Sequence, residues 1–282
     1  GDGRDDLAVS APGADVTGGD SGVVQLYLFT SEGPKKMRGD LSGTVRNGNF
    51  GAALAIADVD SDGTKDLVVT SPVADLAATA QTSSRGVIDV FLGQRGGTVA
   101  DQSSFRLGGW DVTLSKTYKT TNNLRFGRSL AVGDLDGDGL PDLAFSGVVS
   151  ASLADGGLPF RTQPAVAVHF ARAMAPRFVE KPDLFVLPVN FADVDEGTMR
   201  VGYVPKEMNH PAFLLTALDR ADAPNLTADG GSAGGLNAGG VYLFNLTGRG
   251  ASSPEIPTTA DTLERSDAYA RFYGETANWQ MG

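Results

Sequence analysis

Residues 50–72 read FGAALAIADVDSDGTKDLVVTSP, and residues 126–147 read FGRSLAVGDLDGDGLPDLAFSG. The two stretches align without a gap. Each carries a Phe-Gly pair, an apolar run, an aspartate-rich loop and a second apolar run, in that order. Self-similarity of this kind is typical of folds in which one supersecondary unit is repeated and stacked.

Further copies of the motif extend the pattern along the chain. Residues 2–12 superpose on residues 62–72, and residues 191–205 fit a degenerate copy if one residue is deleted. In that degenerate copy Arg200 takes the place of the last aspartate, where it could pair with Asp193 and Asp195 instead of a metal or point into solvent. Residues 279–282 resemble the approach to another Phe-Gly pair. We expect one partial β-propeller over residues 1–282, with approximate repeats at 1–46, 47–121, 122–180 and 181–277 and another beginning at 278–282.

Short apolar runs follow each loop and predict additional strands. Four runs rich in Val, Leu and aromatic residues span 22–29, 86–92, 165–170 and 240–246. Weaker candidates for fourth strands lie at 104–107 and 270–273. Four antiparallel strands per repeat make a propeller blade, so the predicted fold class is all-β, a β-propeller of four-stranded antiparallel blades. The aspartate loops then share one face of the propeller, and we expect long connections at 73–85, 147–164 and 206–239 on the opposite face.

These residues resemble the FG-GAP repeats of the integrin α-subunit head. Phe50-Gly51 and Phe126-Gly127 supply the first element, whereas the second is less faithful, as Ser-Ala-Pro at 10–12 and Thr-Ser-Pro at 70–72. The resemblance implies a seven-bladed propeller, of which this chain holds about four blades. It also implies a protein or glycan partner.

The aspartate loops have the composition of calcium sites. Calcium takes 6 to 8 oxygen ligands, which carboxylates at alternate loop positions supply with little backbone adjustment. The expected ligands, Thr64 and Leu140 acting through their carbonyl groups, are Asp58, Asp60, Asp62, Thr64, Asp66, Asp134, Asp136, Asp138, Leu140 and Asp142. In the first copy, the later ligand positions fall on Asp2, Arg4 through its carbonyl, and Asp6. An EF-hand is excluded because the twelfth loop positions are Val69 and Phe145 rather than Glu.

Charge and composition narrow the partners. The chain has 34 acidic and 23 basic residues and a net charge of -11, which disfavours nucleic acid and anionic membranes and favours cations. No stretch is long and apolar enough for a transmembrane helix, so we expect no direct membrane insertion. The absence of cysteine leaves the compartment open. Calcium loops of extracellular modules bind weakly, with dissociation constants up to about the millimolar range, so such a site would stay empty in the cytosol. We therefore expect this protein to lie outside the cell or on its surface.

The sequence carries no catalytic signature that we recognise. Its 2 histidines are His169 and His210, and His169 occupies a strand position that holds Tyr27 and Phe91 in other copies, which favours packing over catalysis. Nucleophile elbows, phosphate-binding loops and zinc spacings are missing. We therefore expect a non-enzymatic recognition or adhesion module. The alternatives are an accessory propeller of a secreted enzyme and a structural subunit of a cell-surface assembly.

Overall fold

The computed structural model describes residues 5–37, 39–74, 85–94, 98–108, 118–120, 125–153, 161–187, 199–218, 240–250, 261–264 and 267–273. These residues form strands, turns and bends, with no α-helix among them. The chain divides into two compact units. The first comprises Gly1–Trp110 and Asn122–Leu130, and the second comprises Asp111–Thr121 and Ala131–Gly282.

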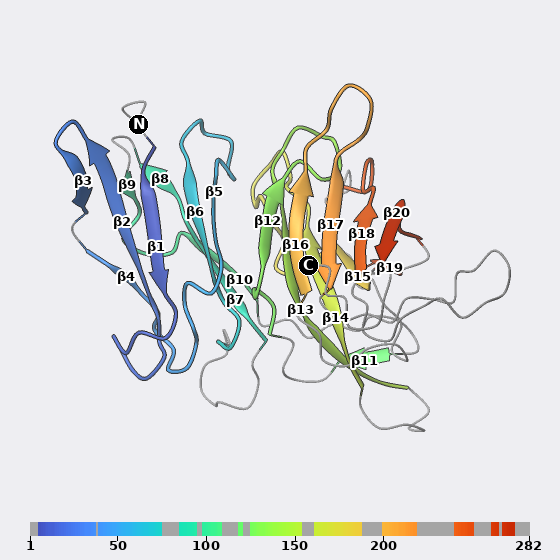
Figure 1. The fold of residues 1–282 in the computed structure, drawn as a ribbon, viewed down its shortest axis with the longest axis horizontal. Coiled ribbons are helices and arrows are strands. Elements are labelled where there is room, and N and C mark those ends of the chain that lie inside the picture. Colours follow the sequence, from blue (N-terminus) through green and yellow to red (C-terminus); the bar gives the residue numbers. More distant parts are fainter. Residues whose placement is uncertain are drawn as a thin grey trace, which may run out of the picture. The chain divides into compact units, whose positions relative to one another are not determined.

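The first unit holds two sheets of four strands each, drawn in blue and cyan to green in Figure 1. The first sheet has the order β1-β2-β3, with β4 also paired to β2. The second has the order β10-β7-β6-β5, and a separate hairpin joins β8 to β9. The bounds are Leu7–Ala11 (β1), Val23–Thr30 (β2), Gly33–Lys36 (β3), Leu41–Ser42 (β4), Leu54–Ala57 (β5), Asp66–Ser71 (β6), Val87–Phe91 (β7), Gly93–Gln94 (β8), Thr98–Val99 (β9) and Phe105–Gly108 (β10).

The second unit also holds two sheets. The third sheet has six strands in the order β11-β13-β14-β15-β19, with β12 paired to β13. The fourth sheet has the order β16-β17-β18-β20. The β15–β19 pairing is parallel, in contrast to the antiparallel pairs of the fourth sheet. The bounds are Tyr118–Thr120 (β11), Leu130–Gly133 (β12), Asp142–Leu153 (β13), Arg161–His169 (β14), Leu184–Leu187 (β15), Met199–Val204 (β16), Phe213–Leu218 (β17), Gly240–Phe244 (β18), Asp261–Glu264 (β19) and Ala270–Tyr273 (β20).

The predicted all-β class is confirmed, including fourth strands at β10 and β20. Three sheets have four antiparallel strands, whereas the sheet that contains β13 and β14 has six strands and one parallel pair. Two of the predicted long connections are wrong. Most of 147–164 lies in β13 and β14, and 206–239 contains β17. The sequence did not predict the outer parts of these strands, because Ser, Ala and Thr make them less apolar. In the structure β13 and β14 pair without interruption, from Leu143 opposite His169 to Ala151 opposite Arg161.

The Phe-Gly pairs have a packing role that the structure makes explicit. Phe50 and Phe126 are buried, at 4% and 0% exposure. The glycines that follow them, Gly51 and Gly127, adopt φ values of 92° and 106°. A Cβ atom on Gly127 would lie 2.8 Å from the Cβ atom of Thr70, a distance that real contacts do not reach. The motif therefore combines an aromatic anchor with a residue that lets one repeat pass closely over the preceding one.

Candidate functional site

Two groups of carboxylates converge on the loops that connect β5 to β6 and β12 to β13. Asp58, Asp60 and Asp62 each offer an oxygen atom within 4.8 Å of the others, and so do the three members of the second group. That second group is Asp134, Asp136 and Asp138. The alternate spacing predicted from the sequence thus brings three side chains together in each loop, as a cation site requires.

Backbone N–H groups hold these carboxylates in place. Asp58 accepts hydrogen bonds from the N–H groups of Asp62 (3.0 Å) and Gly63 (3.0 Å). Asp134 accepts hydrogen bonds from the N–H groups of Gly137 (2.7 Å) and Gly139 (3.0 Å), of which the second is equivalent to the bond from Gly63. The first carboxylate of each loop thus accepts hydrogen bonds from N–H groups three to five residues further along the chain, which folds the loop back around the carboxylate cluster.

The two residues predicted to contribute carbonyl ligands lie at the end of this wrapping. Thr64 donates its N–H to Asp62 at 2.7 Å, and Leu140 donates its N–H to Asp138 at 2.8 Å. These bonds orient the third aspartate of each loop. That Thr64 and Leu140 provide carbonyl ligands stays a prediction.

Asp66 and Asp142, predicted as the last metal ligand of each loop, accept backbone hydrogen bonds from two separate segments. We call this role, in which one carboxylate links two segments, a clamp. Asp66 accepts hydrogen bonds from the N–H groups of Val59 and Gly93, both at 2.7 Å. Asp142 accepts them from Leu135 (2.8 Å), Asp136 (3.3 Å) and Ala171 (2.8 Å). Each carboxylate therefore ties the start of its loop to the segment that follows the third strand. Neither belongs to the groups of three, and their role as metal ligands stays a prediction.

The first copy retains the same clamp. Asp6 accepts a hydrogen bond from the N–H of Phe29 at 3.1 Å. Tyr27 lies opposite Leu7 as Phe91 lies opposite Leu67, so the two positions are equivalent. Phe29 and Gly93 each follow two residues later. The bond from Phe29 to Asp6 is therefore equivalent to the bond from Gly93 to Asp66. The other predicted ligands of this copy, Asp2 and Arg4, lie outside the described residues. Asp6 is thus placed as a strand clamp, a role that its position in the sequence motif did not indicate.

Burial and mutual repulsion oppose ionisation of the inner carboxylates. Burial raises the pKa of Asp142 to about 8, and the nearby charge of Asp136 adds to the effect, against the N–H bonds that lower it. Burial likewise raises the pKa of Asp136, with repulsion from Asp138 and Asp134 contributing. For Asp66, burial again raises the pKa, and Asp60 contributes. Carboxylates in such a setting favour a nearby cation, which offsets both penalties.

The fourth sheet lacks an aspartate loop, which corrects the alignment made from the sequence. Leu214 faces Phe244 as Leu67 faces Phe91, so the loop equivalent to 58–65 is 205–212. Arg200 lies inside β16 opposite Ala217 and does not close a loop. Its placement as the last loop position is therefore wrong, and Asp193 and Asp195 lie outside the described residues.

Aromatic contacts replace carboxylates at this fourth loop. Phe213 takes the position of Asp66, is 4% exposed, and stacks on His210 with ring centroids 5.7 Å apart. Its ring also lies 4.9 Å from that of Tyr269. Glu207 and His210 close the loop with reciprocal backbone hydrogen bonds of 3.1 and 3.3 Å. The loop is thus stabilised by ring packing and a tight turn.

The family comparison matches both aspartate loops. A model described as "FG-GAP repeat" matches residues 50–91 and 126–146, which span the two Phe-Gly pairs, the two clusters and the strands that follow them. The chain contains FG-GAP repeats. The fold expected for FG-GAP repeats, a β-propeller of antiparallel blades, agrees with the sheets described above.

Curated proteins with similar sequences include integrin α subunits and a phospholipase. The chain is 30% identical over 182 residues to integrin alpha-5 of Xenopus laevis, covering 62% of this chain and 16% of that protein. It is 34% identical over 174 residues to human integrin alpha-IIb, covering 59% and 15%. It is 30% identical over 168 residues to rat phosphatidylinositol-glycan-specific phospholipase D, covering 55% and 18%. The chain therefore spans less than a fifth of the length of each of these relatives.

Outside the FG-GAP loops, His169 has the packing environment expected for a strand residue. It is fully buried, its Nδ1–H donates to the carbonyl of Val179 at 3.1 Å, and its ring lies edge-on to Phe145 at 6.0 Å. Burial lowers its pKa to about 3, so the imidazole is neutral at physiological pH. His169 is thus placed as a core residue of the third sheet.

Sequence reasoning missed one buried charged residue in the FG-GAP region, Asp89. It lies in β7, within the apolar run 86–92, and is only 3% exposed. A lone carboxylate inside a Val- and Ile-rich strand is costly unless it is paired, and its partner is Arg106 of β10. The charged residue in an otherwise apolar run was the available signal.

Proposed function

We propose that this chain is a calcium-stabilised recognition or adhesion propeller that acts outside the cell or on its surface. Its partner, a protein or a glycan, binds at the sheet edge opposite the aspartate loops. The observation that carries the proposal is the convergence of three carboxylates within 4.8 Å on each of two loops in FG-GAP repeats. The donor sets contain oxygen atoms alone, which is the ligand type that calcium prefers.

The residues present fit calcium. In each loop backbone N–H groups hold the carboxylates, and one oxygen atom of each of the three lies within 4.8 Å of the others. A bound divalent ion would neutralise charges that otherwise repel. The protein's own contribution is to hold the hairpin loop shut and, through Asp66 and Asp142, to connect that loop to the neighbouring strands.

The strand directions support this proposed location of the partner. The loop 58–65 precedes β6, whereas the connection from β6 to β7 leaves at the other end of the strand. Hydrogen bonds from Ala74 N–H to Ser71 (3.1 Å) and from Gly86 N–H to Ala74 (3.0 Å) fix the base of that connection. Loops carried by a rigid scaffold are the usual location of binding residues.

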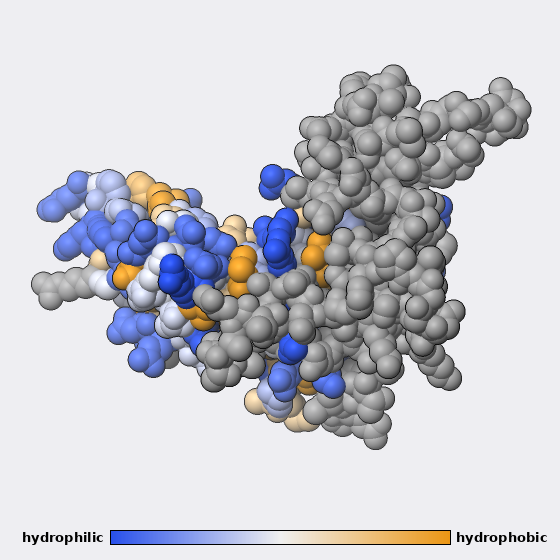
Figure 2. Space-filling model, turned by 90° about the horizontal axis from the view of Figure 1, so that it is seen from below, coloured by the Kyte–Doolittle hydropathy of each residue, from blue (hydrophilic) through white to orange (hydrophobic). Residues whose placement is uncertain are grey.

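On the face shown in Figure 2, hydrophilic residues dominate the part drawn in colour and hydrophobic residues are scattered. No helix among the described residues is long and apolar enough to cross a membrane. Integrin α subunits are among the relatives, which favours a protein partner.

The second candidate function is that of an accessory propeller in a secreted enzyme. The similarity to phosphatidylinositol-glycan-specific phospholipase D favours it, because that relative is named as an enzyme. In this candidate function the propeller accompanies a catalytic domain and does not itself carry out the reaction.

A binding screen with edge-specific variants tests the proposal. The chain, in calcium, is presented to immobilised extracellular matrix proteins and to a glycan array. We expect binding that is lost when residues 75–84 are replaced by a Gly-Ser linker and that persists in Lys65→Gln, an exposed change on the aspartate-loop edge. If Lys65→Gln abolishes binding and the linker variant retains it, the partner binds at the aspartate-loop edge and the proposal is overturned.

A further inference from the structure

A cavity of about 610 Å³ lies within the first unit, between β4 with the residues that follow it and strands β7 and β10 of the second sheet. One wall comprises residues 41–45 and Phe50, and the other comprises alternate residues of β7 together with Arg106 of β10. Residues 101–103 border it as well. Its volume falls within the range of about 300 to 1,000 Å³ that is usual for small-molecule sites.

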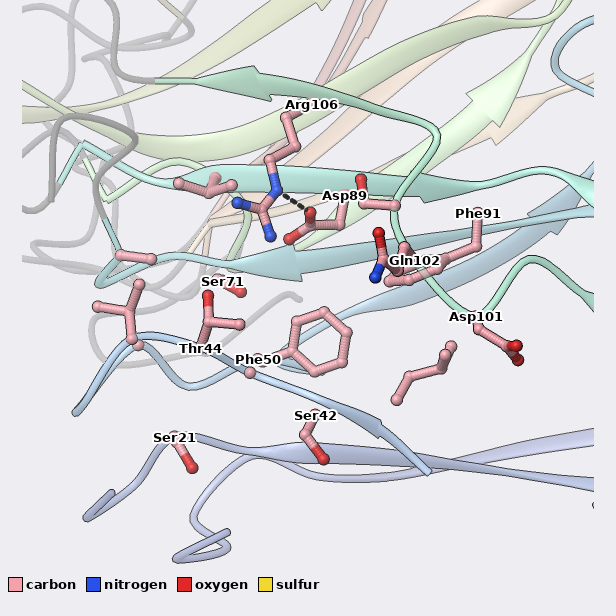
Figure 3. Close-up of a pocket in the computed structure, with 17 residues that line it drawn as sticks. Ser21, Ser42, Thr44, Phe50, Ser71, Asp89, Phe91, Asp101, Gln102 and Arg106 are labelled. Atoms are coloured by element: carbon pink, nitrogen blue, oxygen red, sulfur yellow. Dashed lines mark hydrogen bonds and ion pairs between the residues drawn. The ribbon is translucent and has the colours of Figure 1, made fainter. Parts of the chain in front are cut away.

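An ion pair faces this cavity, with the Asp89 side chain buried and the Arg106 side chain 46% exposed. Asp89 lies opposite Arg106 in the β7–β10 register, and its Oδ1 accepts a hydrogen bond from the Arg106 Nε–H. Within the described residues, Asp89 Oδ2 and the two terminal amino groups of Arg106 take part in no hydrogen bond. Figure 3 shows these groups directed toward the space above Phe50 and Ser71. The pair thus presents one acceptor and a fork of donors side by side.

Apolar and hydroxyl surface complete the lining. Phe50 and Phe91 meet edge to face, with ring centroids 6.1 Å apart and an interplanar angle of 79°. Phe50 is 4% exposed and belongs to the cavity wall, and Ser42, Thr44 and Ser71, labelled near it in Figure 3, add hydroxyl groups to the lining. A ligand of matching chemistry has one apolar face and several groups that both donate and accept hydrogen bonds.

We propose that this cavity binds a neutral sugar, one or two pyranose units in size. Adjacent sugar hydroxyls can donate to Asp89 and accept from Arg106, while the C–H face of the sugar lies along the apolar wall to which Phe50 contributes its small exposed part. The ligand is neutral because the charges of Asp89 and Arg106 cancel, and the exposed carboxylate of Asp101 at the edge of the cavity disfavours anions. The inference goes beyond recognition at the loop edge, because none of these residues belongs to an aspartate loop or to the β6–β7 connection.

The test is saturation-transfer NMR on the whole chain in calcium, with glucose, galactose, mannose and N-acetylglucosamine as separate probes. Glycerol and sulfate serve as comparators for polyols and anions. We expect transfer to at least one pyranose, with weaker or no transfer to glycerol, and no competition by sulfate. Absence of transfer to all four sugars, equal transfer to glycerol, or displacement by sulfate would each overturn the proposal.

Two variants locate the binding. Arg106→Gln removes the donor fork and should weaken sugar binding about tenfold or more, because hydrogen bonds to a charged group are lost. Gln102→Trp places bulk in the cavity from an exposed lining position and leaves the Asp89–Arg106 pair intact. It should weaken binding by a similar factor. If Arg106→Gln fails to fold, Gln102→Trp decides the question alone.

The matched control is Lys36→Gln. This change breaks another ion pair of the first unit, with Asp40 at 2.9 Å, which is exposed and does not line the cavity. Sugar binding should be unchanged in the control. Wild-type affinity in Gln102→Trp, or an equal loss in Lys36→Gln, would contradict a site in this cavity.

Discussion

Replacing Asp142 by alanine separates the clamp role of this residue from a role as metal ligand. Its carboxylate is fully buried and accepts three backbone hydrogen bonds, two of them at 2.8 Å and one at 3.3 Å. The alanine variant would leave three buried N–H groups without an acceptor, at about 1 to 3 kcal/mol each. Relief of a buried charge beside Asp136 offsets part of this cost. We expect a net loss of about 3 kcal/mol in the free energy of unfolding.

The assay is thermal unfolding of Asp142→Ala and wild type, in excess calcium and in excess chelator. A loss of about 3 kcal/mol lowers the melting temperature by about 10 °C for a unit of this size. Because the three N–H donors belong to the protein, the loss should persist in chelator.

The matched control is Asp138→Ala. This carboxylate belongs to the second cluster, is exposed, and accepts one backbone hydrogen bond, from Leu140. Its loss should matter mainly in calcium, by up to about 3 kcal/mol at a hundredfold excess over the dissociation constant. The clamp reasoning is refuted if Asp142→Ala melts within about 1 °C of wild type in chelator and differs only in calcium.

Three further outcomes follow from the same geometry. Gly127→Ala should destabilise by about 3 kcal/mol in chelator and Gly63→Ala by about 1, because both have positive φ but only the first would place a Cβ against Thr70; equal melting shifts would contradict this. Between pH 7 and pH 4, the free energy of unfolding of the wild type should fall by about 3 kcal/mol more than that of His169→Phe, as measured by urea titration. The histidine pKa falls from 6.5 in the unfolded chain to about 3 when folded, so stability is lost as pH drops, and an unchanged slope in the variant would count against burial as the cause. Calcium titration calorimetry should give about two sites, falling to about one in Asp134→Ala; a third site in wild type would show that a loop has been overlooked.

The aspartate loops and most strands could be predicted because their signals are local. Alternate carboxylates followed by glycine specify a tight loop, and short β-branched runs on either side specify a hairpin. The register of Phe91 opposite Leu67, and of His169 opposite Leu143, follows from the same alternation and confirms His169 as a packing position.

The fourth loop could not be predicted, because its stabilising contacts come from distant residues. Phe213 packs on His210 from its own loop and on Tyr269 from the segment before β20. Sequence matching instead followed the aspartates at 193 and 195, since acidic residues dominate the motif. Likewise the clamp role of Asp66 depends on Gly93, which lies 27 residues along the chain. Contacts at such separation leave no pattern in a single sequence.

A crystal structure grown in saturating calcium, with anomalous differences recorded, tests the central claim most directly. We predict one anomalous peak at Asp58, Asp60 and Asp62 and another at Asp134, Asp136 and Asp138, with carboxylate oxygens at about 2.3 to 2.6 Å. The loop 205–212 should show none. Both aspartate loops without a peak, with their carboxylates turned apart into solvent, would contradict a calcium-stabilised propeller.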